Sequence, residues 1–291
     1  MFKGTALRLC AIASVAIASA VAAFAQYGQS PEKTPGVLTP HNVKVGLYYF
    51  SGGGANSILR LSANGLILVD GKLAGNYDEL TRKIRKISDQ SIRVVIDTDH
   101  YEEHTGTNAK FLADGTQVVA QANVKKNLAG YNPPDGNVTP PAVTYDHEET
   151  LHYGQVPVQL LHFGNARTDG DTVVYFPDLK VVAVGDLYAS TPEPDYSAGG
   201  SLVGWGPALA EILKLDFSAA VPGQGPQISK ADLEAFKTKI DTVVSRATRL
   251  VKAGIPESQL ISQLKTDDLG WKLNFSQEQI HGFYAELSRA R

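Results

Sequence analysis

Cysteine is almost absent from this sequence, whose single cysteine, Cys10, lies in an apolar run near the start of the chain. Without that run the chain has no disulfide, no thiolate metal ligand and no cysteine nucleophile. Basic charge is also scarce, because 27 Lys and Arg stand against 30 Asp and Glu. Nucleic-acid binding needs clustered basic charge, so we expect no nucleic-acid partner.

The longest apolar run, Leu9 to Ala23, has the features of a secretory signal peptide. Lys3 and Arg8 precede or border it, and Ala23-Phe24-Ala25 resembles an A-x-A cleavage site. The run is too short and wrongly flanked for a permanent membrane span, although a retained anchor is the alternative. We predict a bacterial-type Sec signal over residues 1–25, export to the periplasm or the exterior, and no membrane attachment after cleavage. Cleavage removes two basic residues and no acidic one, which changes the net charge from −3 to −5.

The rest of the chain has the composition of one folded domain. Residues 26–41 are rich in Pro, Gly and polar groups and predict a flexible leader. Residues 42–291, with C-terminal helices over 230–290, predict a single α/β or α+β domain; in each half strands come first and helices later, an order that is consistent with two packed β-sheets flanked by helices. We expect strands at 43–50, 58–61, 66–69, 92–96, 117–120, 156–163, 173–176, 180–184 and 219–221. We expect helices at 77–87, 108–112, 123–128, 207–213, 230–251, 256–264 and 277–290.

The stretch from Asp97 to Asn108 concentrates polar and ionisable side chains between a β-branched strand and a helix. Turns at the carboxyl ends of strands are where α/β proteins place their chemistry. This turn resembles the metal-binding turn of the metallo-β-lactamase superfamily, T-H-x-H-x-D-H-x-G-G-N, and keeps Thr98, His104 and Gly106 as well as Asn108. Four further stretches resemble that family's landmarks in the right order: 56–70, 167–171 (for H-T-x-G-D), 184–187 and 221–226 (for P-G-H-G-P).

The resemblance covers about residues 42–265 and implies a four-layer αββα sandwich. It also places seven residues at the family's ligand positions for two zinc ions. Asp99, Tyr101 and Arg167 stand at the three-histidine site, Glu103, His104 and Gln224 at the other site, and Asp186 at the bridging position. Most of these differ from the family's ligands. A guanidinium cannot ligate because it stays protonated, so the resemblance implies a degenerate dinuclear site.

Three hypotheses for function follow from this substitution pattern. In the first, Arg167 replaces the charge of a metal by pairing with Asp99 and Asp186, and the protein is a binding protein or vestigial enzyme without standard zinc hydrolase activity. In the second, the chain is a hydrolase that uses one atypical divalent or trivalent metal at Glu103, His104 and Asp186, with iron or manganese favoured over zinc. In the third, catalysis is metal-free: Arg167 stabilises an oxyanion, and Asp99 or Glu103 is the general base.

Other motifs are weaker. His100 to His104 satisfies the inverted zinc-peptidase pattern H-x-x-E-H, but that motif needs a helix and here a strand leads directly into it. A serine-hydrolase elbow, G-x-S-x-G, is absent, and the glycines at 52–54 are not followed by the Gly-Lys-Ser/Thr of a phosphate-binding loop. The sequence leaves the small-molecule ligand or substrate and the oligomeric state open.

Overall fold

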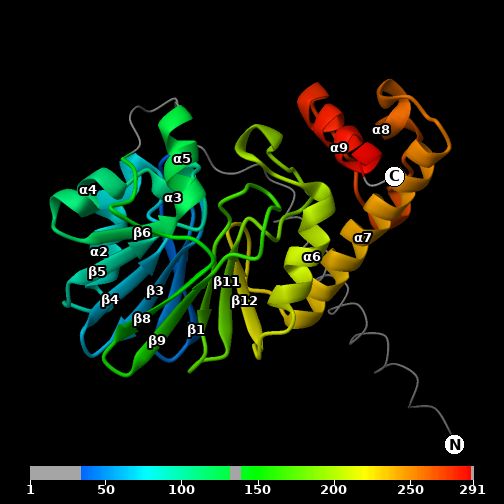
Figure 1. Cartoon of the computed structure of the whole chain (residues 1–291). Coiled ribbons are helices and arrows are strands. Elements are labelled where there is room, and N and C mark those ends of the chain that lie inside the picture. The colour runs from blue at the N-terminus through cyan, green and yellow to red at the C-terminus, as the bar shows by residue number, and fades with distance from the viewer. Residues whose placement is uncertain (1–33, 132–138, 290–291) are drawn as a thin grey trace, which may run out of the picture.

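The computed structural model describes residues 34–131 and 139–289, so the predicted signal peptide and most of the predicted leader lie outside the described residues. Two β-sheets form the centre of the molecule (Figure 1). The first sheet has the strand order β1(Thr39–Lys44), β2(Leu47–Ser51), β3(Ser57–Ser62), β4(Gly65–Val69), β5(Ile92–Ile96), β6(Gln117–Gln121), β7(Val143–Tyr145). The second has the order β12(Ala219–Pro222), β11(Val181–Gly185), β10(Val173–Phe176), β9(Val156–Leu161), β8(Glu148–Tyr153).

Helices cover the outer faces of both sheets, with α2, α4 and α5 on the first and α6 and α7 on the second (Figure 1). The helical elements are η1(Ala74–Asn76), α2(Tyr77–Arg85), α3(Glu102–Thr105), α4(Asn108–Ala113), α5(Ala122–Gly130), η2(Tyr196–Ala198), α6(Leu202–Ile212), α7(Lys230–Lys252), η3(Glu257–Gln259), α8(Leu260–Gln263), η4(Asp267–Leu269) and α9(Gln277–Arg289). The predicted four-layer arrangement of two sheets between helices is confirmed.

The alternation of side chains along the strands explains the layers. In β4, Ile67 and Val69 point into the cluster between the two sheets, whereas Leu66 and Leu68 point into the cluster under α2 and α4. Successive side chains of a strand face opposite sides, so a strand covered on both faces is apolar at every position. This explains why residues 66–69 form a continuous hydrophobic run rather than an alternating one.

Several predicted boundaries differ from the structure. The predicted strand 43–50 is two antiparallel strands, β1 and β2, joined at Gly46, whose φ of 74° lies in the left-handed region. The first strand begins at Thr39, inside the predicted leader, and Leu38 is fully buried. Strands β7 and β8 lie in a region where no strand was expected. Helix α6 begins at Leu202, five residues before the predicted start at Pro207, so this proline lies inside the helix and cannot donate a backbone N–H there.

The carboxyl ends of two pairs of parallel strands, one pair in each sheet, bring the polar turns together. Strand β4 leads to Asp70 and the adjacent β5 leads to Asp97, while β11 leads to Asp186 and the adjacent β12 leads to Gly223. Asn56 connects the two sheets at this end, because its backbone N–H donates to Gly223 O (2.7 Å) and its side-chain amide to Pro222 O (2.9 Å). Residues far apart in sequence therefore meet at one edge of the sandwich.

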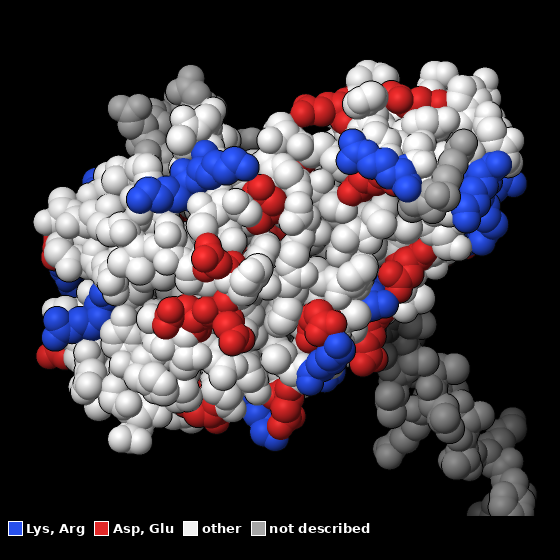
Figure 2. All heavy atoms as spheres, in the orientation of Figure 1, with Lys and Arg blue, Asp and Glu red and all other residues white. Residues whose placement is uncertain are grey.

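No helix of the described residues combines the length and the apolar character that a membrane crossing requires. On the face shown in Figure 2, acidic side chains lie across the middle and basic side chains lie mostly nearer the edges.

Candidate functional site

His104 is the centre of the site. It lies in the short helix α3, directly after the turn that follows β5, and its side chain is fully buried. Its Nδ1 lies 3.0 Å from Asp70 Oδ2 and 3.1 Å from the Thr98 hydroxyl, which itself donates to Asp70 Oδ2 (2.8 Å). A carboxylate at one imidazole nitrogen fixes the ring's orientation and directs the other nitrogen toward a ligand. Asp70 therefore positions His104.

The other nitrogen of His104 faces two carboxylates. Nε2 lies 3.4 Å from Asp99 Oδ2 and 3.7 Å from Asp186 Oδ1, and one ligand atom from each of the three residues falls within 4.8 Å of the others. Neither Asp99 Oδ2 nor His104 Nε2 has a hydrogen-bond partner among the described residues, although both are buried. Ligands of a tetrahedral ion with bonds of about 2.1 Å are separated by roughly 3.4 Å. The spacing of the three side chains fits one metal ion.

Glycine is required where the second sheet approaches this group. A Cβ on Gly223 would lie 2.2 Å from Asp186 Oδ1, and the Gly223 N–H donates to Gly185 O (2.8 Å). Only a residue without a side chain lets the β12 turn pass this close to the carboxylate. The P-G stretch at 222–223 thus shapes the space around Asp186.

Arg167 lies on the other side of Asp186. Its Nε lies 3.1 Å from Asp186 Oδ2, its Nη1 donates to Glu193 O (3.2 Å), and its guanidinium carbon lies 4.6 Å from the centre of the Tyr101 ring. A guanidinium over a tyrosine face is a favourable cation–π contact. The predicted pair of Arg167 with Asp186 is therefore present, whereas the ion-pair contact found for Asp99 is with His104.

Tyr101 is held away from the donor group. Its hydroxyl donates to Asp195 Oδ2 at 2.5 Å, and its ring stacks on His100 with the ring centres 4.4 Å apart. Asp195 also accepts from Ser197 N (3.0 Å) through Oδ1, as the cap of η2. A phenol engaged in this way is unsuited to bind a metal together with Asp99.

The ionisation of the group follows from its burial and its neighbours. Burial raises the pKa of Asp99 well above its usual range. Burial alone would lower the pKa of His104, but Asp99 and Asp70 hold it well above its usual range. Burial would raise the pKa of Asp186, but Arg167 and His104 lower it to about 2. Without a metal, His104 and Arg167 are therefore cations, and Asp186 is the ionised partner of both.

Five of the seven predicted positions lie together, and they do not play equivalent parts. His104, Asp99 and Asp186 form the compact group, with Arg167 and Tyr101 beside it. Glu103 is buried, and its main-chain carbonyl accepts from Ala55 N (3.2 Å), yet it lies outside the compact group. Gln224 follows Gly223 and has a buried side-chain nitrogen without a partner among the described residues. The structure thus offers Asp99 where the sequence suggested Glu103 as the third metal ligand.

Sequence reasoning gave no role to three contributors to the site, although Asp70 closes the 56–70 landmark. Asp70 ends a buried strand, which was a usable signal, because strand-terminal carboxylates gather at functional edges. Asp195 matches no family landmark and becomes important only through Tyr101. Lys72 is fully buried in a left-handed conformation (φ 78°), and its ammonium donates to Phe50 O (2.7 Å), Gly52 O (2.8 Å) and Ala55 O. It thereby fixes the glycine-rich turn at the rim of the site.

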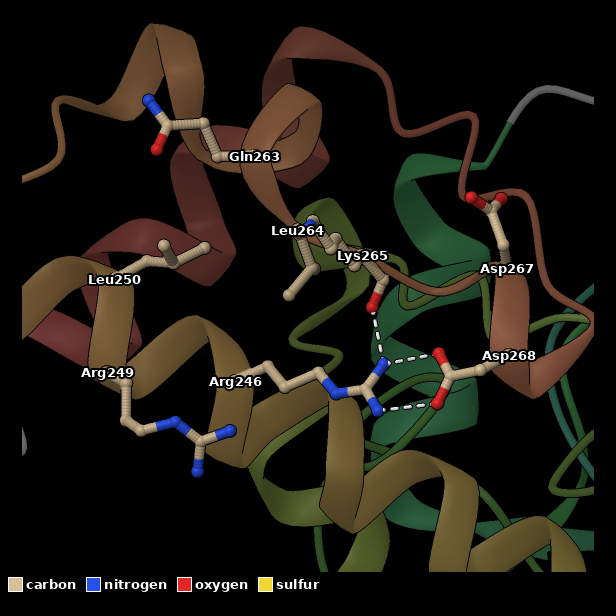
Figure 3. A pocket seen from close by; sticks show the side chains of 8 residues that line it. All are labelled: Arg246, Arg249, Leu250, Gln263, Leu264, Lys265, Asp267 and Asp268. Carbon is tan, nitrogen blue, oxygen red and sulfur yellow. Dashed lines mark hydrogen bonds and ion pairs between the residues drawn. The ribbon is translucent and has the colours of Figure 1, made fainter.

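A cavity of about 250 Å³ opens beside Arg167 and Tyr101. Its other walls are the 193–196 segment and the start of α9, which Gln279 joins by donating to Pro194 O (3.2 Å). A larger cavity of about 610 Å³ lies among α7, α8 and η4 (Figure 3). There Arg246 binds both carboxylate oxygens of Asp268 (2.7 and 2.6 Å), and none of the predicted site residues lines it.

Comparisons with known proteins agree with this architecture. A metallo-β-lactamase from Pontibacter korlensis superposes with a TM-score of 0.62 at 18% identity and covers 70% of this chain and 99% of its own. The metallo-β-lactamase FIM-1 from Pseudomonas aeruginosa in the mono-zinc form has a TM-score of 0.62 at 17% identity and covers 77% and 99%. The chain has the metallo-β-lactamase fold. The resemblance predicted from the sequence motifs is confirmed.

Sequence relatives of this metallo-β-lactamase-fold chain are distant. Metallo-beta-lactamase type 2 of Bacillus cereus is 26% identical over 194 residues, which are 62% of this chain and 71% of that protein. The 2,4-dinitroanisole O-demethylase subunit alpha of Nocardioides sp. (strain JS1661) is 24% identical over 165 residues, 56% of this chain. The match spans only half the length of that subunit. No family model matches the chain.

Proposed function

We propose that this protein is an exported, hydrolase-type member of the metallo-β-lactamase fold that has lost the dinuclear zinc site and holds a single metal ion at Asp99, His104 and Asp186. The observation that carries the proposal is that the buried atoms Asp99 Oδ2 and His104 Nε2 make no hydrogen bond, although they face each other at the 3.4 Å distance of an ion pair beside Asp186. Buried polar atoms without a hydrogen bond cost free energy, and an ion coordinated by both atoms would recover it.

The same geometry speaks against two zinc ions. The three-histidine position of the family is represented by Asp99, by a tyrosine whose hydroxyl donates to Asp195, and by a guanidinium beside Asp186. Neither of the last two groups supplies a ligand, and a fixed cation 3.1 Å from Asp186 repels a second metal there. On this basis we propose that the standard dinuclear zinc hydrolase activity is absent.

The remaining residues have defined parts in this proposal. A metal held by two carboxylates and one imidazole would act as a Lewis acid toward a carbonyl or phosphoryl oxygen, and such a donor set favours iron or manganese over zinc. Asp70 orients His104, and Arg167 supplies fixed positive charge between the donor group and the 250 Å³ cavity. Arg167 is thus placed to bind an oxygen of a substrate in that cavity.

A second candidate is a metal-free site. Three carboxylates, Asp70, Asp99 and Asp186, surround His104, and they raise the pKa of His104 well above its usual range in spite of its burial. An imidazolium would then fill the place of the ion and leave Arg167 as the group that stabilises an oxyanion. This candidate corresponds to a binding protein or to an enzyme with a carboxylate base.

Metal stoichiometry separates the two candidates. Protein purified without a chelator or histidine tag is dialysed against manganese, iron(II) or zinc, and bound metal is counted by mass spectrometry. We expect one equivalent of metal for the wild type and less than 0.2 equivalents (about a fivefold loss) for Asp99→Asn and for His104→Asn. The control Glu103→Gln should bind nearly one equivalent, because the carboxylate of Glu103 lies outside the group. No metal in the wild type under any loading would overturn the single-metal proposal, and two equivalents would overturn the degenerate-site proposal.

A further inference from the structure

The cavity beside Arg167 has an uneven distribution of charge. Arg167 is the cation among its lining residues, and its charge is balanced by Asp186 at 3.1 Å. Three carboxylates, Glu193, Asp195 and Glu278, line the same cavity. The net charge around the cavity is therefore negative, and it stays negative with a divalent ion bound, because Asp99 and Asp186 together with the three wall carboxylates outnumber the charges of the ion and Arg167.

Among these three carboxylates, Asp195 is held in place by hydrogen bonds, whereas Glu193 and Glu278 are exposed. Asp195 accepts a hydrogen bond from the Tyr101 hydroxyl and caps η2. Burial alone would raise the pKa of Asp195, but hydrogen bonds from Ser197 and Tyr101 hold this pKa below its usual range. Glu278 lies in the first turn of α9, and the neighbouring Gln279 joins that turn to the 193–196 segment. The acidic wall thus belongs to two segments that are tied together.

Two ends of the cavity therefore differ. The inner end presents the guanidinium of Arg167, which is paired with Asp186 of the candidate metal group, and the outer end presents carboxylates. The face of the Tyr101 ring is already occupied by Arg167, so charge rather than an aromatic cage selects the ligand. A volume of about 250 Å³ admits only a small molecule.

We propose that the substrate of this site is a small, positively charged compound, with an acceptor oxygen directed at Arg167 and an ammonium group directed at the wall formed by Glu193 and Glu278. Carboxylate-bearing substrates are disfavoured there by like-charge repulsion. This inference rests on the proposed function, which places the reaction at the metal-binding group. Arg167 lies between that group and the cavity, because it pairs with Asp186 and also lines the cavity.

Three ligands of matched shape test the proposal: choline, its neutral isostere 3,3-dimethylbutan-1-ol, and the anion 3,3-dimethylbutanoate. Binding is followed by NMR titration of the full folded protein at low ionic strength, with shifts assigned to residues 193–196 and 276–279. We expect choline to bind at least about fivefold more tightly than the alcohol, the anion to bind most weakly, and the preference to shrink at 0.5 M salt, where the Debye length is only about 4 Å.

Variants locate the source of the preference. Glu278→Gln and Glu193→Gln are each expected to reduce the choline preference at least about twofold, while Glu234→Gln, which removes the same charge from an exposed position of α7, leaves it unchanged. Equal or tighter binding of the alcohol or the anion would overturn the substrate class, as would an equal loss in Glu234→Gln. Metal stoichiometry is measured on the same samples. A protein without metal that still prefers choline disproves the proposed function alone, and a metal-binding protein without the preference disproves the substrate class alone.

Discussion

Arg167 Nε lies 3.1 Å from Asp186 Oδ2, and this ion pair forms the boundary between the candidate metal group and the cavity. The guanidinium supplies positive charge to the same carboxylate that faces His104 through its other oxygen. Asp186 thus belongs both to a candidate metal site and to an ion pair, and the two roles can be separated by substitution.

Replacing Arg167 by Met is expected to destabilise the metal-free protein. The change removes one of the two cations beside the buried carboxylate of Asp186 and leaves only His104, which costs about 3 kcal/mol in the free energy of unfolding. Urea unfolding measures the loss. The matched control is Arg82→Met, whose pair with Glu79 lies on the exposed face of α2 and contributes almost nothing. Equal stability of the Arg167 variant and the wild type would show that the pair does not support the fold.

Replacing Gly223 by Ala is expected to disturb Asp186. The added Cβ would lie 2.2 Å from Oδ1, so that the carboxylate or the β12 turn has to move. We expect a loss of about 1–3 kcal/mol in the free energy of unfolding and at least about tenfold weaker metal binding. Gly130→Ala is the control, since a Cβ there meets nothing within 4 Å. Unchanged metal affinity in the Gly223 variant would remove Asp186 from the ligand set.

The Asp195 carboxylate predicts a dependence of stability on pH. Its pKa in the folded protein lies below the usual 3.8, so the unfolded chain binds more protons in this range and stability falls as pH falls. The contribution is fully present above about pH 5 and is lost as the pH drops through the folded pKa below 3.8. Unfolding of wild type and Asp195→Asn between pH 6 and about pH 3 measures it.

In that experiment the difference in stability between the wild type and Asp195→Asn narrows toward low pH. The control is Asp89→Asn, an exposed loop position, for which we expect no comparable narrowing. A difference that stays constant with pH would mean that the Tyr101 and Ser197 hydrogen bonds do not depend on the charge of Asp195.

Replacing Lys72 by Met removes the ammonium that binds three main-chain carbonyls of the glycine-rich turn. The carbonyls lose their partner in a buried place, which costs about 2–4 kcal/mol in the free energy of unfolding. Thermal and urea unfolding measure the effect, with Lys125→Met on the exposed side of α5 as the control. If the Lys72 and Lys125 variants are equally stable, Lys72 does not organise the turn.

Sequence patterns were sufficient for most of the fold. The hydrophobic run at 66–69 and the β-branched run at 92–96 correspond to β4 and β5, because strand segments buried on both faces are apolar; β4 is buried along its whole length and β5 from Val94 to Ile96, whereas Arg93 is exposed. The patterns failed where a tight turn at Gly46 divides one apparent strand into β1 and β2, and where the polar edge strand β8 carries too little apolar signal to be recognised.

By itself the sequence, through its resemblance to the family's motifs, determined four of the residues that gather at the site. Polar turns placed after strands fix Asp99, His104, Arg167 and Asp186 at one edge of two packed sheets, whatever the detailed packing. Only the tertiary structure decided which of these side chains face one another as possible metal ligands and which bind other partners. Whether Asp99 or Glu103 joins His104, and whether Tyr101 turns toward a metal or toward Asp195, depends on side-chain directions and on contacts between segments about 90 residues apart. Those contacts form only when both sheets are assembled, so no local pattern encodes them.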